Sequence, residues 1–309
     1  MIRQRGVILI SVLILVALAA IIATALFFET AMSARRTASS FAMEQAVQLG
    51  QGAESLAANL LSDDKPEVDS LDEDWAMPYG PFEVDTGVSL EAQLTDEEGK
   101  FNINSMMKPD GSRDDNAIKV FSRLLTLSGL DSNWAELIVD WIDTDTVPGP
   151  GGGEDSLYIA RKPPHLTGNQ TLTSISELQQ IPQFTPALYA KLAPHITALP
   201  PNVRQINVCT ADGFVLDALY ALSATDSRHV EHSQRSKQET DKARSTGCFP
   251  KRTDLIADEP TIAPLVAEHS NYFRLRTVIV IGTAQFALYS LMYRNGTQPR
   301  AVLRSFGTE

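Results

Sequence analysis

The first 61 residues predict one long helix. Val7–Phe28 contains no charged side chain and consists mostly of Val, Ile, Leu, Ala and Phe. As a helix this run would be about 33 Å long, enough to cross the hydrocarbon core of a bilayer. Residues 30–61 contain no proline, and their apolar positions recur at helical spacing. We therefore expect a membrane-spanning helix that continues into a globular head, along which it lies with one apolar side.

Hydrophobic patterning in the head predicts an α+β fold with an antiparallel sheet. An acidic connection over residues 62–80 follows the long helix. Alternation of apolar and polar residues then predicts strands in residues 82–94 and 100–104, and a further short strand is expected at 203–208. Helical spacing predicts helices at residues 116–127, 134–142, 174–180, 185–196 and 212–223. Residues 226–246 are polar throughout and predict a loop. Strong strand signals end the chain at residues 272–282, 284–293 and 300–306, and Asn295-Gly296 predicts a hairpin turn.

The residues in front of the apolar run leave three interpretations open. Met1–Gly6 is a short basic leader that contains Arg3 and Arg5. A cleaved secretory signal has an apolar region of about 7–15 residues, which is shorter than the run here. A simple signal anchor fits, with the arginines retained in the cytoplasm. A prepilin-like leader also fits, and it would be cleaved between Gly6 and Val7.

Charge and cysteine content narrow the class of protein. The chain has 26 Lys and Arg against 38 Asp and Glu, a net charge of −12, so a nucleic-acid partner is not expected. Two cysteines cannot build a disulfide-rich scaffold or a four-cysteine zinc site. Together with the apolar N-terminal run, this composition argues against a soluble cytosolic enzyme.

An acidic cluster between residues 140 and 155 is the sharpest chemical signal. Its members are Asp140, Asp143, Asp145, Glu154 and Asp155, separated by a Pro- and Gly-rich turn at residues 148–153. Carboxylates at this density repel one another unless a cation lies among them, and hard oxygen ligands on a flexible loop suit Ca²⁺. The spacing does not match an EF-hand. A solvated acidic helix end is the alternative, and a hydrolytic carboxylate pair is a weaker one.

Two further features have a structural and a functional interpretation. If the head lies outside the cytoplasm, Cys209 and Cys248 are expected to form a disulfide at the base of the 226–246 loop; otherwise they are two buried thiols. Residues 175–199 resemble a helix-hairpin-helix unit, but Gln183 occupies the place of the glycine found in DNA-binding versions. We interpret this unit as structural packing, and we interpret none of the five histidines as a metal ligand.

Several motifs occur in one order along nearly the whole chain. They are Arg3-Gln-Arg-Gly6, Gly99-Lys-Phe-Asn-Ile-Asn104, Asp140-Trp-Ile-Asp-Thr-Asp145, Gly153-Glu-Asp-Ser-Leu-Tyr158, Ser176-Glu-Leu-Gln-Gln-Ile-Pro182 and Ile206-Asn-Val-Cys-Thr-Ala211. In this order they resemble the minor pseudopilin K family of type II secretion systems, also called general secretion pathway protein K. Two positions depart from that family: Cys209 stands where the family has Asn, and Gly152-Gly153 stands where it has Gly-Ala.

The resemblance implies a pilin-like fold in which the long N-terminal helix packs on an antiparallel sheet. It divides the chain into a leader (1–6), a transmembrane helix (7–28), the helix continuation with the first strands (29–104), an inserted helical domain (105–202) and the rest of the head (203–309). It also implies cleavage at Gly6–Val7 by the prepilin peptidase and N-methylation of Val7. The head would lie in the periplasm, anchored by a single pass through the inner membrane.

The resemblance also implies a non-enzymatic role at the tip of the pseudopilus in the export of folded proteins. Its partners would be the minor pseudopilins I and J, with H as a further candidate, together with the major pseudopilin and the inner-membrane secretion platform. The implied cofactor is structural Ca²⁺, at the acidic residues 140, 143, 145, 154 and 155. Most pilin-like proteins have Glu as the fifth mature residue, to pair with the N-terminal amine of a neighbouring subunit. Here that position is Ser11, which suits a subunit with no neighbour above it.

Two other classes of function remain as rival hypotheses. A membrane-anchored DNA receptor of a competence system would share the pilin-like leader and the helix-hairpin-helix unit, but it would need a basic face. A membrane-anchored periplasmic hydrolase would use the carboxylates of residues 140–155, but no nucleophile or base converges on them in the sequence.

Overall fold

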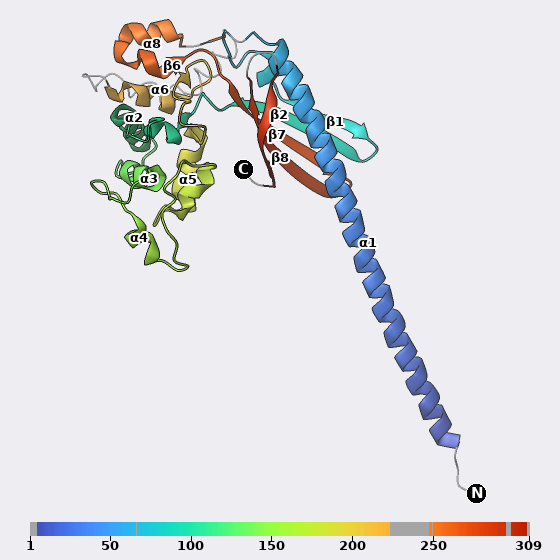
Figure 1. The fold of residues 1–309 in the computed structure, drawn as a ribbon. Coiled ribbons are helices and arrows are strands. Elements are labelled where there is room, and N and C mark those ends of the chain that lie inside the picture. The colour runs from blue at the N-terminus through green and yellow to red at the C-terminus, as the bar shows by residue number, and fades with distance from the viewer. Residues whose placement is uncertain (1–4, 66, 223–246, 249, 295–297, 308–309) are drawn as a thin grey trace.

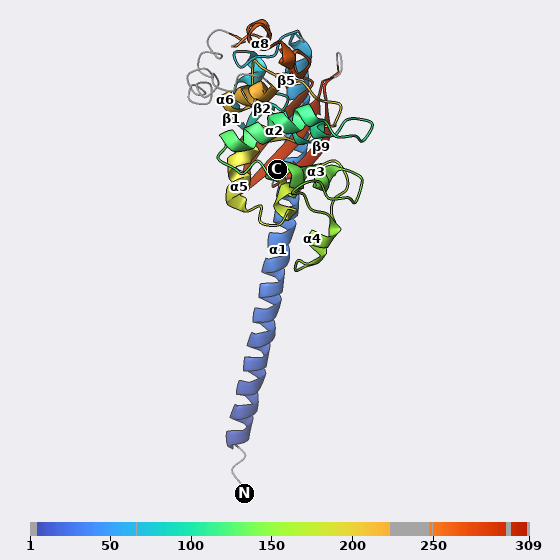
Figure 2. The same ribbon diagram turned by 90° about the vertical axis from the view of Figure 1, so that its left-hand side faces the viewer.

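The computed structural model describes residues 5–65, 67–222, 247–248, 250–294 and 298–307 (Figure 1). A single long helix, α1 (Arg5–Asp63), has the N-terminus at its free end and a head at its other end. The head contains a five-stranded sheet against which the upper part of α1 packs, and a group of short helices beside the sheet (Figures 1 and 2). The prediction of an α+β fold with a long N-terminal helix is confirmed.

The main sheet combines strands from the beginning and from the end of the head's sequence. Its strand order is β1-β2-β7-β8-β9, and every neighbouring pair is antiparallel. The strands are β1 (Tyr79–Asp85), β2 (Val88–Asp96), β7 (Tyr272–Ile281), β8 (Ala284–Tyr293) and β9 (Arg300–Phe306). In the pairing of β2 with β7, Val88 lies opposite Ile281 and Asp96 lies opposite Phe273. The chain therefore leaves the sheet after residue 96 and returns at residue 272.

The second half of α1 is fixed to the sheet by small residues and one buried carboxylate. Ala46, Ala53 and Ala57 share a core with Phe273 and Ile279. A side chain at Gly50 would place its Cβ 2.5 Å from Leu288, so glycine permits this close approach. Glu54 is buried and accepts hydrogen bonds from Ser290 and from Arg304. The apolar first half, from Leu9 onward, is exposed, and its most apolar stretch of membrane-spanning length is 0% buried.

We call the group of short elements between the two parts of the sheet the helical lobe. Its helices are η2 (Ile103–Met106), α2 (Asp115–Leu127), α3 (Trp134–Ile142), α4 (Asp155–Ile159), η3 (Ile175–Gln180), α5 (Pro186–Leu192), η4 (Ala193–His195), α6 (Gly213–Leu219), η5 (Tyr220–Leu222), α8 (Arg252–Asp258) and η7 (Pro260–Leu265). Two short parallel pairs join them, β3 (Phe101–Asn102) with β4 (Ile196–Thr197) and β5 (Ile206–Asn207) with β6 (Val266–Ala267). A further short helix, η1 (Asp74–Ala76), precedes the sheet and buries Trp75.

The described residues form two hydrophobic cores. The first lies between α1 and the sheet, and the second lies within the helical lobe. The second core extends from Phe101 to Val266 and includes Val215, Leu216 and Leu255. The predicted boundary at residue 202 therefore does not coincide with a boundary between the cores, because α6 and α8 pack with the lobe and not with the sheet.

Two asparagines connect distant parts of the lobe. Asn102 donates to the carbonyls of Pro200 and Val203 and accepts from the amide of Leu199. Asn104 donates to the carbonyls of Leu172 and Leu199 and accepts from the amide of Leu172. Each amide side chain thus satisfies buried backbone groups about 70–100 residues away in sequence. The Asn-Ile-Asn run is consequently a structural element of the lobe.

Most predicted helices and strands are present, with a few differences of type and length. The predicted helix at 174–180 is a 3₁₀ helix, η3, which begins after its cap, Ser174, and ends before Ile181-Pro182. The strand predicted at 203–208 is reduced to Ile206–Asn207. The short helices α4 and α8 were not predicted, since five and seven residues give too little periodicity. The turn at 295–296 and the loop at 226–246 lie outside the described residues.

Candidate functional site

The predicted acidic cluster lies at the end of α3 and the start of α4, in the helical lobe (Figure 2). Asp143 caps the C-terminus of α3, and Glu154 is the residue before α4 begins. The structure brings three carboxylates together: ligand atoms of Asp143, Asp145 and Glu154 all lie within 4.8 Å of one another. Asp143 and Glu154 are buried, whereas Asp145 is exposed.

Two oxygens in this group have no hydrogen-bond partner among the described residues. They are Asp143 Oδ1 and Glu154 Oε1, and both are inaccessible to solvent. Burial, together with the carboxylates of Asp145 and Asp140, raises the pKa of Asp143 to about 6. Burial and the carboxylate of Asp143 likewise raise the pKa of Glu154. Buried carboxylate oxygens normally have a donor or a cation beside them, so this donor set fits a hard divalent cation.

The other two predicted members of the cluster make different contacts. Asp140 is buried and accepts a hydrogen bond from the amide of Gly149 at 3.0 Å. Asp155 accepts from the amide of Thr167 at 3.0 Å and from its hydroxyl. Both residues shape the loops around the three carboxylates. The structure therefore places Asp140 and Asp155 outside the group that could hold one ion.

Glycines in the turn between α3 and α4 allow the chain to close around Asp140. A Cβ built on Gly152 would lie 2.0 Å from Asp140 Oδ2, so no larger residue fits without displacing that carboxylate. Gly151 has a φ of +86°, in the left-handed region that glycine adopts without strain. The Gly-rich run thus positions Glu154 next to Asp143.

The two cysteines form a disulfide between Cys209 and Cys248, with a Cα–Cα distance of 4.3 Å. Cys209 is buried in the core of the helical lobe, and its amide donates to the side chain of Asn207. Cys248 lies just before α8, where the neighbouring Arg252 amide donates to Glu268. The bond therefore ties α8 to the segment that follows β5.

Removal of the disulfide is expected to lower the free energy of unfolding by about 4 kcal/mol, from the entropy of closing a loop across a sequence separation of 39 residues. The double variant C209S/C248S should show this loss in chemical denaturation. Adding a reductant should lower the stability of the wild type toward that of the variant and leave the variant unchanged. Equal stability of the two proteins under oxidising conditions would show that the bond contributes little.

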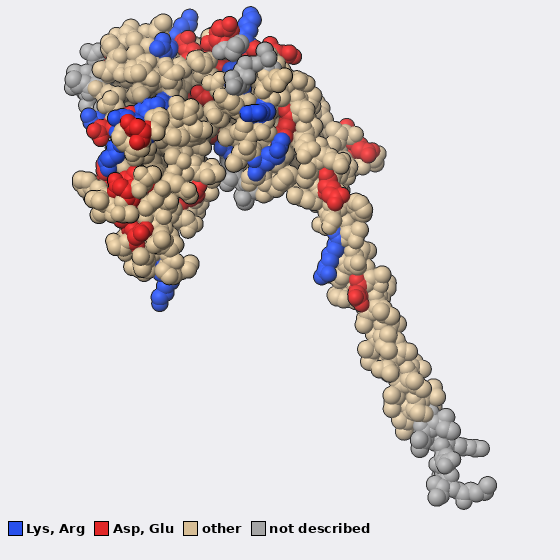
Figure 3. All heavy atoms as spheres, viewed as in Figure 1, with Lys and Arg blue, Asp and Glu red and all other residues tan. Residues whose placement is uncertain are grey.

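The helix-hairpin-helix unit is packed into the lobe. Leu178, Ile181 and Leu192 are buried in the lobe core. Gln183 has a φ of +66°, which is the conformation that a glycine would adopt without strain at this bend. Acidic and basic side chains are interspersed on the face of the head shown in Figure 3. These observations favour the packing interpretation over a phosphate-binding one.

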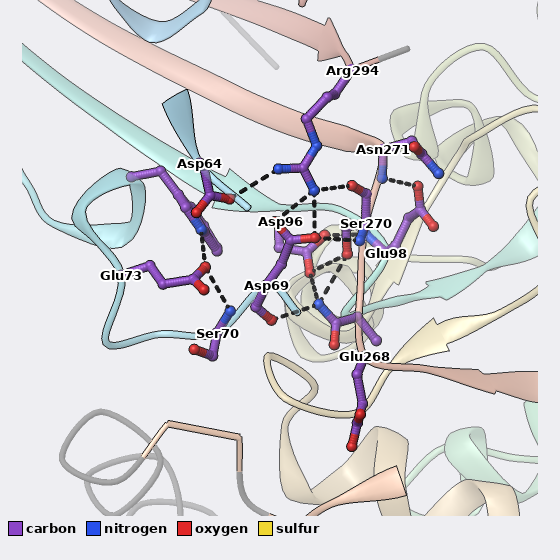
Figure 4. A network of polar contacts seen from close by, with 12 residues as sticks. Asp64, Asp69, Ser70, Glu73, Asp96, Glu98, Glu268, Ser270, Asn271 and Arg294 are labelled. Atoms are coloured by element: carbon purple, nitrogen blue, oxygen red, sulfur yellow. Dashed lines mark hydrogen bonds and ion pairs between the residues drawn. The ribbon is translucent and has the colours of Figure 1, made fainter. Parts of the chain in front are cut away.

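A polar junction between the sheet and the helical lobe was not predicted as a site. It consists of Asp64, Asp69, Asp96, Glu98, Asn207, Ser270 and Arg294, which come from separate parts of the chain (Figure 4). The sequence signal was the acidic triplet at residues 96–98, which lies between the strands predicted at residues 82–94 and 100–104.

Arg294 is the cation of this junction and is 3% exposed. Its guanidinium donates to Asp69 at 2.6 Å, to Asp64 at 2.9 Å and to the carbonyl of Ser270 at 2.7 Å. Burial nevertheless raises the pKa of Asp69 to about 7, against the opposing effect of Arg294. One guanidinium thus joins the end of β8 to the connection that follows α1 (Figure 4).

Asp96 and Asn207 connect the junction to the lobe. Asp96 is buried and accepts from the hydroxyl of Ser270 at 2.7 Å and from the side-chain amide of Asn207 at 2.9 Å. Asn207 also donates to the carbonyl of Asp69 at 2.9 Å. Because Asn207 belongs to β5, these bonds fix the lobe to the end of β2.

The fold and these contacts define a class of protein. A long N-terminal helix with an exposed apolar first half, whose second half lies on an antiparallel sheet, is the architecture of a pilin-like protein. The helical lobe, inserted between β2 and β7, distinguishes this chain from a minimal version of that architecture.

Comparison with known proteins identifies the family. A family profile for the type II secretion system protein K matches residues 99–201. The chain is 31% identical to the type II secretion system protein K of Klebsiella pneumoniae over 99% of this chain and 97% of that protein. It is also 31% identical to the protein K of Pseudomonas aeruginosa, over 94% and 89% of the two chains. The chain therefore belongs to the type II secretion system protein K family.

A solved structure confirms the fold. The crystal structure of the GspK-GspI-GspJ complex from enterotoxigenic Escherichia coli contains a chain that matches with a TM-score of 0.74 and 26% identity. The match covers 89% of this chain and 100% of that chain. This protein is accordingly a minor pseudopilin of type II secretion, as the order of motifs in the sequence predicted.

Proposed function

We propose that this protein caps the tip of the pseudopilus, helps to start its assembly and so supports the export of folded proteins. The observation that carries the proposal is the helical lobe, which lies beside the sheet and adds a second core to the head (Figures 1 and 2). Subunits in a helical shaft pack closely on all sides, whereas a subunit at the end has one free side. The lobe is therefore compatible with an end position.

The partners we propose are the minor pseudopilins I and J. The similar solved structure is a complex of GspK with GspI and GspJ, and the match covers that GspK-like chain along its whole length. Ser11 supports a terminal place in such a complex, because it cannot supply the charge with which most pilin-like subunits recruit a neighbour. The major pseudopilin, and pseudopilin H as a further candidate, would then lie below.

We further propose that the N-terminus is processed and anchored as in prepilins. Gly6 and Val7 lie in the first turn of α1, directly before the apolar run that could span the inner membrane. Cleavage between them would make Val7 the first residue, which the prepilin peptidase would then methylate. The head would be periplasmic, where a disulfide such as Cys209–Cys248 persists.

Intact-mass measurement of the membrane-extracted protein tests this processing. A mature chain that begins at Val7 and carries one added methyl group is the expected result. A chain that keeps residues 1–6, in cells with an active prepilin peptidase, would leave only a signal anchor. The variant Gly6→Leu is the control, since it should remain uncut in the same cells.

Structural calcium is the proposed cofactor. Asp143, Asp145 and Glu154 would hold the ion, because their carboxylate oxygens lie close together. Two of these oxygens are buried and accept no hydrogen bond from the described residues. The ion would neutralise the repulsion among these carboxylates and fix the loop between α3 and α4. Asp140 and Asp155 would support the loop from outside the ion's contacts. The role is structural, and no step of catalysis is assigned to these residues.

A further inference from the structure

Glu98 occupies the crossing point between the sheet and the helical lobe. It lies two residues beyond the end of β2, in the connection into the lobe. Its backbone carbonyl accepts from the amide of Asn207, in β5, at 2.8 Å. Its side-chain Oε1 accepts from the amides of Asn271 at 2.7 Å and Tyr272 at 3.1 Å, where β7 begins (Figure 4). A single residue thus contacts both halves of the head.

The charges that face Glu98 are of its own sign. The carboxylates of Asp96, from β2, and Asp69, from the connection after α1, lie in the same junction, and the Tyr272 phenol lies on β7. The cation of the junction, Arg294, donates to Asp64 and Asp69. The adjacent Glu97 points elsewhere, to Lys100, Arg274 and Thr197. Among the residues that the structure describes, no lysine or arginine forms an ion pair with Glu98.

Hydrogen bonding distinguishes Glu98 from its two acidic neighbours. Asp69 accepts from the Arg294 guanidinium and from the amide of Ser270, so its charge is partly balanced. Asp96 accepts at both oxygens, from the amide of Glu98 and from Ser270 and Asn207. Both bonds to the Glu98 side chain end on Oε1. A proton on Oε2 would therefore leave the contacts with Asn271 and Tyr272 intact.

We propose that Glu98 makes the joint between the helical lobe and the sheet sensitive to pH. With a proton on Oε2, the side chain is neutral and the joint is closed as the structure shows it. Without that proton, three buried carboxylates face one another beside one guanidinium, and the joint opens more often. The position of the lobe relative to α1 and the sheet would then be less fixed in alkaline surroundings.

The direction of the pKa shift agrees with this geometry. Burial, together with the carboxylates of Asp96 and Asp69, raises the pKa of Glu98 to about 7, against two backbone hydrogen bonds that lower it. The closed state therefore holds a proton that the open or unfolded chain releases above its ordinary pKa near 4.5. Stability from this group is complete below about pH 4.5, decreases as pH rises and is lost above about pH 7. One such proton changes the opening equilibrium by at most about tenfold per pH unit.

Hydrogen exchange of the full-length protein in detergent, from pH 5 to pH 8, tests the proposal. After correction for the intrinsic exchange rate, opening of peptides covering residues 268–275 should increase with pH and then level off near pH 7. The increase is up to about tenfold per pH unit for each of the two protons involved, on Glu98 and on Asp69. Peptides from β8 should not show this increase. The variant Glu98→Gln keeps a neutral acceptor at this position. Its increase in opening with pH should lack the contribution of the Glu98 proton and retain the contribution of the Asp69 proton. Glu83→Gln, on exposed β1, is the matched control.

Three results would overturn the proposal. They are an identical pH dependence in Glu98→Gln and the wild type, an equal effect of Glu83→Gln, or pH-independent protection of residues 268–275 in the wild type. If Glu98→Gln does not fold, the wild-type comparison of residues 268–275 with β8 decides the question alone. None of these results depends on tip location or on partners.

Discussion

Replacing Arg294 with leucine is expected to lower the free energy of unfolding by about 3–5 kcal/mol, the cost of leaving a buried charge without its partner. Arg294 is 3% exposed and donates to Asp64, Asp69 and the carbonyl of Ser270. It also lies over the ring of Phe273, 5.1 Å from the ring centroid. Loss of the guanidinium leaves Asp69 buried beside Asp96, with no cation between them. Urea denaturation of the full chain in detergent would measure the change.

Arg276→Leu is the matched control for this prediction. Arg276 lies on β7, its side chain is 48% exposed, and its nearest carboxylate, on Glu91, is 4.0 Å away. Exposed pairs of this kind contribute about 0–1 kcal/mol, so the control should be close to the wild type. Equal losses in the two variants would contradict the view that Arg294 holds the joint between sheet and lobe.

Calcium is expected to raise the melting temperature of the wild type, and Asp143→Asn is expected to abolish that response. At a free calcium concentration about 100 times the dissociation constant, binding adds about 2.7 kcal/mol of stability. For a chain of 309 residues that corresponds to roughly 4 °C. Asp143→Asn removes one of the three converging carboxylates, together with its charge. Thermal melts with calcium and with a chelator would measure both effects.

The variant Asp155→Asn tests whether the calcium response depends only on the three converging carboxylates or also on the wider acidic cluster. Asp155 contacts Thr167 and not the group of three, so this variant should keep the calcium response. Loss of the response in Asp155→Asn would extend the ligand set to Asp155. A wild type whose melting temperature is the same in calcium and in chelator would contradict the calcium proposal itself.

Local patterns in the sequence were sufficient for the elements that are long or strictly periodic. The uninterrupted apolar run predicted the first half of α1, and strong strand signals predicted β7 and β8. The acidic cluster was predicted as a candidate site because its members lie within 16 residues of one another. Which of them converge was not predictable, because Asp140 and Asp155 are drawn away by the amides of Gly149 and Thr167.

The polar junction shows what local patterns cannot reveal. Asp69, Asp96, Asn207 and Arg294 are separated by up to 225 residues, and no periodicity relates them. They meet because the chain leaves the sheet after β2 and returns to it in β7. The junction therefore forms from residues that this long connection separates in sequence. The extent of the lobe core was missed for the same reason, since α6 and α8 follow residue 202, yet α6 packs against α2 and the residues of both helices belong to the lobe core.

Immunogold labelling of pseudopili is the most direct test of the account. Filaments would be assembled from the major pseudopilin together with this chain and the minor pseudopilins I and J, and labelled with antibodies raised against the helical lobe. The account predicts gold at one end of each filament, with none along the shaft. Gold distributed along the shaft would contradict a tip position and would show that the helical lobe can be accommodated between packed subunits.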